Sequence, residues 1–144
     1  MNAKQGKNVF SSFRTLLRGY NDFVTACTGE YELSPNEAAV LSELQKATTA
    51  SAIAKSLDVS KALVSRSVKA LKEKGLIEIA ISETDKREQN LRLTESGLKI
   101  AGLIDDAETR FYEIVSEGSE ARGINFMELT LKLFIKNLNT RGGQ

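Results

Sequence analysis

The sequence carries a hairpin pattern in the middle of an otherwise helical chain. Ile77, Ile79 and Ile81 recur at every second residue, and so do Leu91 and Leu93, which is the period of a half-buried β-strand. Between the two runs, "SETDKRE" is too polar to be buried. A connection of about two to five residues would suffice if this segment were only a turn. The pattern therefore predicts a two-stranded hairpin whose charged tip contacts something outside the domain.

Helical patterns lie on both sides of this hairpin. Apolar residues at steps of three and four predict a first helix over residues 8–29. Ser34 then starts a second helix, because Pro35 and Glu37 supply the first helical position and the return partner of a capping box. Gly75 stands where the helix before the hairpin should end. The later helices have their expected N-caps at Thr49, Ser60 and Thr94.

The C-terminal segment "INFMELTLKLFIKNLNT" is apolar on nearly every side if it is helical. A helix of this kind must be buried on more than one side. In a chain this small another subunit is the easiest cover, so the segment predicts a homodimer. Gly118 and Gly123 are expected to break the helical pattern before this last helix.

Positive charge is concentrated in one short segment of a nearly neutral chain. The formal net charge is +1, but residues 61–74 hold five cations against Glu73 alone, a local balance of +4. The stretch "TTASAIAKSLDVSKALVSRSVKALKEKG" is typical of a helix, a short turn and an amphipathic second helix, which helix-turn-helix proteins place in the DNA major groove. If Val64, Val68 and Leu71 face the core, the opposite side is free for DNA. The candidate DNA-binding residues of this recognition helix are Ser60, Lys61, Ala62, Ser65, Arg66 and Lys69.

These residue types suit different parts of a duplex. Arg66 can bond guanine O6 and N7 with two parallel hydrogen bonds, and Ser65 can bond a base edge or a phosphate. Lys61 and Lys69 are suited to phosphates, as are the free backbone N–H groups at Ser60. Taken alone, the pattern is equally consistent with an ordinary solvated basic helix.

The order of two helices followed by a hairpin predicts a winged helix, in which the hairpin is the wing. Its tip can reach the minor groove beside the recognition helix, where a narrow groove attracts arginine. The candidate tip residues are Asp85, Lys86 and Arg87. Arg87 is the residue expected to insert, and Asp85 would steer an arginine as its intramolecular partner. The alternative is a solvated turn pair that contributes little.

Three stretches, "LSPNEAAVLSEL", "SAIAKSLDVSKALVSRSVKALKEKGLIE" and "SETDKREQNLRLTESG", resemble the multiple-antibiotic-resistance regulator (MarR) family over Leu33 to Gly97. The most specific parts of this resemblance are the D-x-R pattern in the wing and the L-T-x-x-G pattern at the end of the wing. The resemblance implies a homodimeric winged-helix repressor, often released from its operator by a small ligand or by oxidation. It assigns Arg66, Asp85 and Arg87 to DNA contact and the wing. Two segments depart from the family pattern: "SKALVSR" lacks the usual serines and threonines, and "EGSEARGINF" is broken by glycines.

The predicted fold class is mainly α (α+β), and 144 residues suit one domain over residues 1–144. Residues 33–97 would form the winged helix-turn-helix lobe with its two-stranded wing. Residues 8–30 and 95–140 would supply the N- and C-terminal helices of a dimerisation region.

The composition argues against several function classes. The chain has no histidine and one cysteine, which removes the commonest metal ligand and general base. It also lacks a Gly-rich phosphate loop, so we expect no catalytic residues, no metal and no cofactor. No apolar run is long enough to span a membrane. The N-terminal residues lack the apolar stretch and the small-residue cleavage site of a signal peptide, so we expect that the protein is not exported. A single cysteine suits a reducing compartment, so the expected location is the cytoplasm.

Two questions stay open at the level of sequence. The first is a sensor: Cys27 continues an apolar stripe and is expected to be a packing residue, and a ligand crevice lined by Phe13, Arg14, Leu17 and Tyr20 is implied only by the family resemblance. The second is the partner. Double-stranded DNA is the leading prediction, and the alternative is an interaction module that docks its basic face on an acidic protein.

Overall fold

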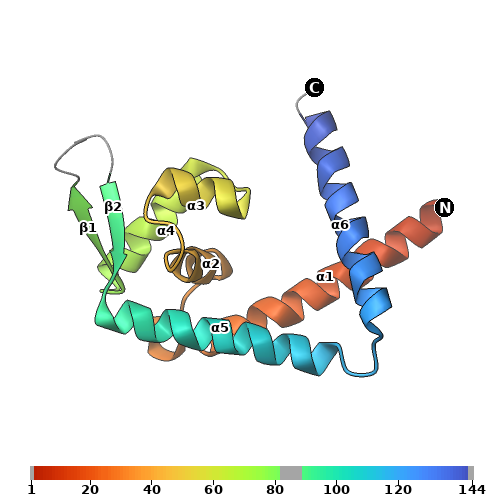
Figure 1. Cartoon of the computed structure of the whole chain (residues 1–144), viewed down its shortest axis with the longest axis horizontal. Coiled ribbons are helices and arrows are strands. Elements are labelled where there is room, and N and C mark those ends of the chain that lie inside the picture. Colours follow the sequence, from red (N-terminus) through yellow and green to blue (C-terminus); the bar gives the residue numbers. More distant parts are fainter. Residues whose placement is uncertain (1, 82–88, 143–144) are drawn as a thin grey trace. The chain divides into compact units, whose positions relative to one another are not determined.

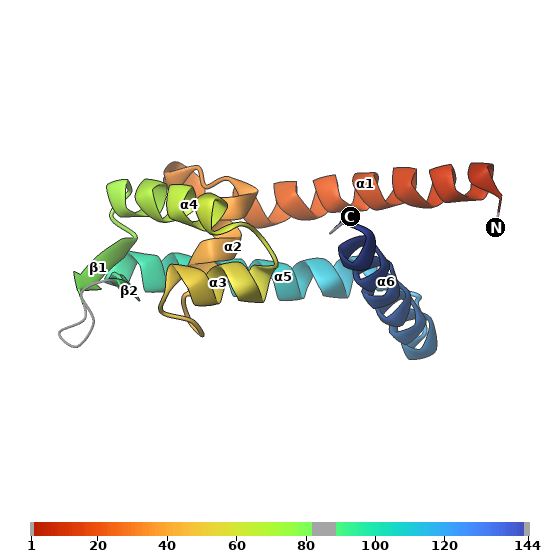
Figure 2. The same cartoon turned by 90° about the horizontal axis from the view of Figure 1, so that it is seen from above.

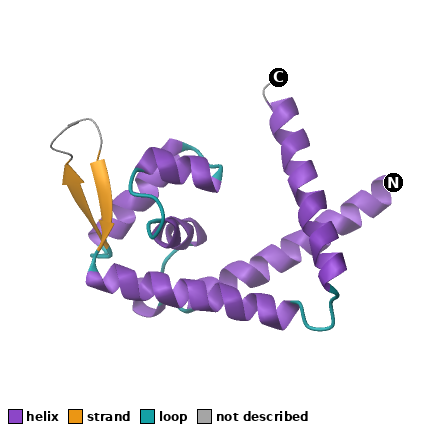
Figure 3. Cartoon of the chain, viewed as in Figure 1, coloured by secondary structure: helices purple, strands orange, loops and turns teal. Residues whose placement is uncertain are grey.

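The computed structural model describes residues 2–81 and 89–142 of the chain. Within them the fold is helical except for one antiparallel pair of strands (Figures 1 and 3), so the predicted fold class is confirmed. The elements are α1 (Ala3–Ala26), the short 3₁₀ helix η1 (Gly29–Tyr31), α2 (Pro35–Glu43), α3 (Ala50–Leu57), α4 (Lys61–Glu73), β1 (Ile77–Ile81), β2 (Gln89–Leu93), α5 (Glu95–Val115) and α6 (Ala121–Gly142).

The helix starts follow the capping residues predicted from the sequence. The Ser34 hydroxyl accepts the Glu37 N–H at 3.2 Å, and the Glu37 carboxylate accepts the Ser34 N–H in return. The Thr49 hydroxyl accepts the Ala52 N–H at the start of α3, and the Ser60 hydroxyl accepts the Leu63 N–H at the start of α4. The Thr94 hydroxyl accepts the Gly97 N–H at 3.0 Å at the start of α5. Each cap satisfies an N–H group that the helix itself leaves without a partner.

Two predicted helix boundaries are wrong. The first helix begins at Ala3 and ends at Ala26, where residues 8–29 were expected, because the Asn2 side chain caps it by accepting the Gln5 N–H at 2.8 Å. Its first turns are polar and therefore do not show in the apolar stripe. Gly123 does not break the pattern, since it lies inside α6; Gly118, with φ +79°, lies in the break itself.

The chain divides into two compact units, residues 1–111 and residues 112–144. In the N-terminal unit α2 contacts α1, α3 and α4 (Figures 1 and 2). The core contains Val64, Val68 and Leu71 of α4, as predicted from the amphipathic pattern. Its largest fully buried apolar side chains are Val40, Leu41, Ile53, Val64, Leu71, Leu76 and Ile104.

Polar contacts fix the helices around this core. Tyr20 of α1 donates a 2.9 Å hydrogen bond to the Glu108 carboxylate of α5, and burial together with this bond raises the pKa of Tyr20 to about 12. The Tyr20 ring also packs edge-on against Phe111. Asp105 of α5 accepts hydrogen bonds from Ser42 and Gln45, both at 2.8 Å. Residues 105–111 of α5 therefore join this helix to α1 and to the end of α2.

A second polar contact joins the end of α4 to the start of α2. Lys74, the C-cap of α4, lies 2.6 Å from a carboxylate oxygen of Glu37. Burial by itself would raise the pKa of Glu37, but the hydrogen bonds from Lys74 and Ser34 outweigh it and hold the pKa below its usual value. The ionised pair thus anchors the C-terminal end of α4 to the N-terminus of α2.

The C-terminal unit consists of the last residues of α5, the turn and α6. No residue of α6 is buried in the single chain, although the helix is rich in large apolar side chains. Phe126 is 62% exposed and Leu138 is 70% exposed. The expectation that this helix needs a cover from outside the chain therefore stays a prediction. None of the helices in the described ranges is both long and apolar enough to cross a membrane.

Candidate nucleic-acid interface

The turn between α3 and α4 sets the direction in which α4 leaves the core. Asp58 ends α3 in the left-handed conformation (φ +53°), which aspartate adopts more readily than most residues. The Val59 N–H then bonds the Ala54 carbonyl at 3.0 Å, and Ser60 starts α4. The two helices pack directly against each other, which gives the helix-turn-helix predicted from the sequence.

All six predicted recognition-helix residues are exposed on one region of the surface. With Val64, Val68 and Leu71 buried, the 3.6-residue period leaves the opposite stripe of α4 free. Among the residues that the structure describes, no acidic group lies within ion-pair distance of Lys61, Arg66 or Lys69. The cations of this stripe are therefore available to a ligand. The exposed residues are Ser60, Lys61, Ala62, Ser65, Arg66 and Lys69.

The wing stands beside α4 (Figure 1). Its register pairs Ile77 with Leu93 and Ile79 with Leu91, so the apolar residues share one face as the alternation predicts. Ile77 and Leu91 are buried, whereas Glu78 and Arg92, which pair with each other, are exposed. The wing is thus packed on the lobe by one face. The predicted tip residues Asp85, Lys86 and Arg87 lie outside the described residues.

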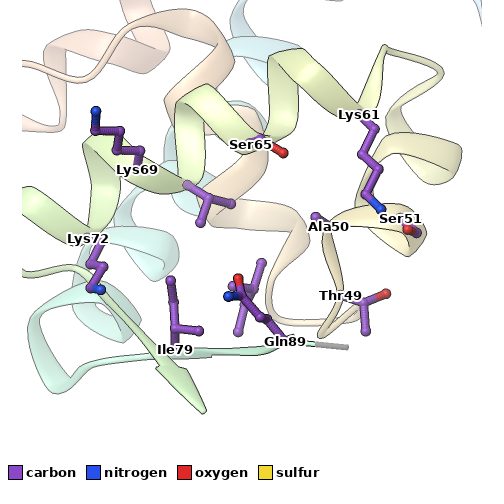
Figure 4. A pocket seen from close by; sticks show the side chains of 11 residues that line it. Thr49, Ala50, Ser51, Lys61, Ser65, Lys69, Lys72, Ile79 and Gln89 are labelled. Carbon is purple, nitrogen blue, oxygen red and sulfur yellow. The ribbon is translucent and has the colours of Figure 1, made fainter. Parts of the chain in front are cut away.

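A cavity of about 530 Å³ separates α4 from the wing (Figure 4). Its apolar lining includes Val68 of α4, Ile79 of β1 and Leu91 of β2. Among the residues that the structure describes, the polar lining contains three lysines and no acid. Sequence reasoning assigned Lys61, Ser65 and Lys69 of this lining to the interface but missed the others, although Lys72 continues the same helical stripe at a step of three. The polar lining residues are Thr49, Ser51, Lys61, Ser65, Lys69, Lys72 and Gln89.

The base of the wing is tied to its surroundings at two points. The Leu91 N–H bonds the Thr48 carbonyl at 2.7 Å, which joins β2 to the segment before α3. At the other end the Thr94 hydroxyl donates to the Gly75 carbonyl at 2.8 Å, and the Thr94 N–H donates to the Leu76 carbonyl at 3.1 Å. Thr94 therefore fastens the exit of the wing to the turn after α4.

The candidate sensor residues do not form one site in the N-terminal unit. Phe13 and Leu17 are exposed on α1, and Tyr20 is engaged with Glu108. The Cys27 thiol is half-buried and donates to the Val24 carbonyl, and burial raises its pKa, which disfavours the reactive thiolate. These features support a packing role for Cys27. No three Asp, Glu or Cys side chains in the described ranges are grouped so that they could hold a metal ion.

A helix-turn-helix with a cationic second helix and an adjacent two-stranded wing defines the class of winged helix-turn-helix proteins. Within this class, residues 31–88 match the sequence model described as the MarR family. This match covers most of the winged helix-turn-helix lobe, and it confirms the resemblance to a family of transcriptional regulators, not of enzymes, that the sequence indicated.

Solved structures have the same fold along most of the chain. A MarR/EmrR-family transcriptional regulator from Acinetobacter sp. ADP1 has a TM-score of 0.77 at 24% identity, over 97% of this chain and 99% of its own. A MarR protein from Peptoclostridium difficile has a TM-score of 0.79 at 22% identity, over 93% and 89%. MepR of S. aureus, solved in complex with DNA, has a TM-score of 0.77 at 20% identity, over 89% and 96%. At these identities the likeness shows the fold. No curated protein matches the chain.

Proposed function

We propose that the chain is a transcriptional repressor that binds a pseudo-palindromic operator in double-stranded DNA as a homodimer. The observation that carries this proposal is the exposed face of α4, where Lys61, Arg66 and Lys69 have no acidic partner among the described residues. A buried stripe fixes the opposite face of the same helix, so the cations are held outward on a rigid element. The structural likeness to MepR, whose structure contains DNA, supports the same partner.

The residues of this surface take different roles in the proposal. Arg66 would read a guanine in the major groove, because its two N–H donors match O6 and N7. Ser65 and Ala62 would contact neighbouring base edges, the latter through a thymine methyl group. Lys61, Lys69 and the N–H groups at Ser60 would fix the helix on phosphates. From the wing, Arg87 would enter the minor groove with Asp85 as its orienting partner and Lys86 beside it.

The homodimer is proposed from the apolar surface that the single chain leaves exposed. α6 carries Phe126, Leu129 and Leu133 at helical spacing, each more than half exposed. α1 also exposes large apolar side chains, among them Phe13 and Leu16. Monomeric proteins rarely expose large apolar patches, and a second copy would cover these helices. Two-fold pairing would then present two recognition helices to one duplex.

Only the match of residues 31–88 to the MarR family supports the remaining parts of the proposal. These are action in the cytoplasm, where the DNA is, and release from the operator by a small-molecule effector. The test of the central claim is to sequence the DNA that the purified protein enriches from random fragments. We expect two related half-sites whose centres lie about 10–10.5 bp, or a multiple of this distance, apart. Enrichment of no sequence would contradict the proposal.

Replacing Arg66 by alanine should remove discrimination at one base pair of each half-site. The expected cost is about 1–3 kcal/mol for the preferred base and little for the other three, because a bidentate contact to guanine is lost. Competition between duplexes that each carry one changed base pair measures the discrimination at every position of the half-site. The matched control is Lys69→Ala, which should weaken binding to all sequences alike. If neither Arg66→Ala nor Arg87→Ala changed DNA affinity, an acidic protein partner would be the better assignment.

Replacing Leu133 by aspartate should weaken dimerisation by at least about tenfold, because two carboxylates would be buried in the proposed interface. Sedimentation equilibrium over a range of protein concentrations measures the dissociation constant. Asn139→Asp introduces the same group on the stripe of Glu128 and Lys132, whose ion pair is solvated, and should leave the constant unchanged. A wild-type protein that stays monomeric at every concentration would exclude the homodimer.

A further inference from the structure

The C-terminal end of α4 is closed in a way that holds the backbone of Lys74 in place. The Leu76 N–H donates to the Leu71 carbonyl at 3.0 Å, and Gly75 before it has a φ of +74°. This glycine-terminated end satisfies carbonyl groups that the last turn leaves without a partner. Lys74, the C-cap residue, therefore extends its side chain from a fixed point at the end of α4.

The ammonium group of Lys74 has two acceptors at the start of α2 and just before it. It lies 2.6 Å from one carboxylate oxygen of Glu37 and 3.4 Å from the carbonyl oxygen of Glu32. The other carboxylate oxygen of Glu37 accepts the Ser34 N–H, so both oxygens are engaged. The Glu37 side chain is only 14% exposed. A short charge-assisted contact that is shielded from much of the solvent restrains its two partners more strongly than a pair in open water does.

The two acceptors belong to a well-ordered connection between α1 and α2. The Thr28 side chain is buried, and its hydroxyl donates to the Thr25 carbonyl at 2.7 Å and accepts the Leu33 N–H at 3.2 Å. Glu32, at the end of η1, adopts the left-handed conformation with φ +47°. Hydrogen bonds therefore continue from the last turn of α1 to the start of α2, and Lys74 attaches the end of α4 to this connection.

Apolar packing by itself defines the direction of α4 less sharply. Val64, Val68 and Leu71 hold the helix on the core, but apolar contacts have no preferred direction. With 13 residues, α4 is about 20 Å long. A rotation of about 10° about its C-terminal end would move its N-terminus by roughly 3 Å, whereas a recognition side chain must be held to within about 0.5 Å. A restraint at the C-terminal end therefore controls what the residues at the other end can reach.

We propose that Lys74 is a positioning residue, whose ion pair with Glu37 sets the direction of α4 relative to α1 so that both recognition helices of the homodimer reach their half-sites together. The proposal rests on DNA binding by a homodimer, as argued above. α1 carries exposed apolar side chains that are proposed to contact the second copy. An error in the direction of α4 relative to α1 is therefore an error in the separation of the two recognition helices, and two-fold pairing applies it twice.

The alternative role for Lys74 is a direct contact with a DNA phosphate, and Glu37→Gln separates the two roles by the sign of its effect. Loss of a negative charge should by itself strengthen binding to DNA. If the ion pair positions α4, operator affinity should instead fall by about tenfold, because a misdirected recognition helix loses base contacts. Glutamine also serves in a capping box, so the start of α2 should remain intact.

The matched control is Glu32→Gln, which removes the same charge close to the same place. The Glu32 side chain is exposed and has no ion-pair partner among the described residues, while its backbone carbonyl, the group that Lys74 contacts, is unchanged by the substitution. Its operator affinity should stay constant or rise. Urea unfolding should give nearly the wild-type midpoint for both variants, because a partly exposed ion pair contributes little to stability.

The spacing of the half-sites supplies a readout that a loss of stability would not change. The probes are the operator duplex enriched from random fragments and the same duplex with one base pair inserted between its half-sites. Glu37→Gln and Lys74→Met should each lower the affinity ratio of these two duplexes, because a less restrained α4 discriminates spacing less well. The double variant should lose no more operator affinity than either single variant, since both remove one interaction. Lys74→Arg retains the charge and should retain most of the affinity.

The outcomes separate this proposal from the proposed function. Wild-type operator affinity and spacing discrimination in Glu37→Gln would overturn the positioning role and leave the function intact, whereas absence of DNA binding by the wild type would overturn both. A salt slope on random DNA that falls by about 0.9 per subunit in Lys74→Met would assign Lys74 to a phosphate and overturn its positioning role. Additive losses in the double variant, or losses explained entirely by unfolded protein, would overturn it as well.

Discussion

Replacing Gly97 by alanine should destabilise the N-terminal unit by about 3 kcal/mol or more. A Cβ atom at this position would lie 1.9 Å from the carbonyl oxygen of Leu76 and 2.9 Å from its carbonyl carbon. Both are backbone atoms of a buried residue, so no side-chain rotation can relieve the overlap. Urea unfolding of the two proteins, followed by circular dichroism, measures the loss of stability as a lower midpoint.

The cost is large because the close approach lies where three elements meet. The Leu76 carbonyl accepts the Thr94 N–H, and the Gly97 N–H is held by the Thr94 hydroxyl. Moving α5 away from Leu76 would break both bonds and separate the wing exit from the end of α4. DNA affinity should therefore fall together with stability, because the wing and α4 would no longer be held in fixed positions relative to each other.

The matched control is Gly102→Ala in the same helix. A Cβ atom at Gly102 would have nothing within 4 Å, so alanine should stabilise α5 by about 0.5–1 kcal/mol through its better helix propensity. The two substitutions add the same methyl group and should shift the unfolding midpoint in opposite directions. Equal shifts for both variants would mean that the contact at Gly97 does not control the packing of α5.

The local features of this fold could be predicted from the sequence because they depend on short-range chemistry. The caps at Ser34, Thr49 and Ser60 bond N–H groups three residues away, and the buried stripe of α4 follows from the helical period alone. The same holds for the apolar face of the hairpin. What failed was also local: the polar start of α1 has no apolar period, so Asn2 was not recognised as its cap.

The cavity between α4 and the wing could not be predicted in this way. Lys72 was visible as one cation in a basic segment, but nothing in its neighbours along the chain says that Gln89 and Ser51 lie across a cavity from it. That arrangement depends on the hydrogen bond between Leu91 and Thr48, which are far apart in sequence. The sequence therefore predicted the exposed face of α4 but not the residues that line the opposite wall of the cavity.

Raising the salt concentration from about 50 to 200 mM should weaken operator binding by about a thousandfold. Lys61, Lys69 and Lys72 on each of two subunits would make six phosphate contacts, and each contact releases counterions when it forms. The slope of log affinity against log salt should be similar for the operator and for random DNA, because phosphates carry no sequence information. Plots of log affinity against log salt for the two DNAs should therefore be parallel lines. The vertical distance between them should be the logarithm of the affinity ratio, to which Arg66 contributes.

Fluorescence anisotropy with labelled duplexes, repeated at four or more salt concentrations, gives both slopes. Equal slopes for the two DNAs are stronger evidence for phosphate contacts than a steep slope alone, because salt would also release an acidic protein partner. Only a polyphosphate backbone gives the same slope with unrelated base sequences. An affinity that stays flat over this range would mean that the lysines of α4 do not meet phosphates, and the DNA-binding face would then have to be sought elsewhere on the chain.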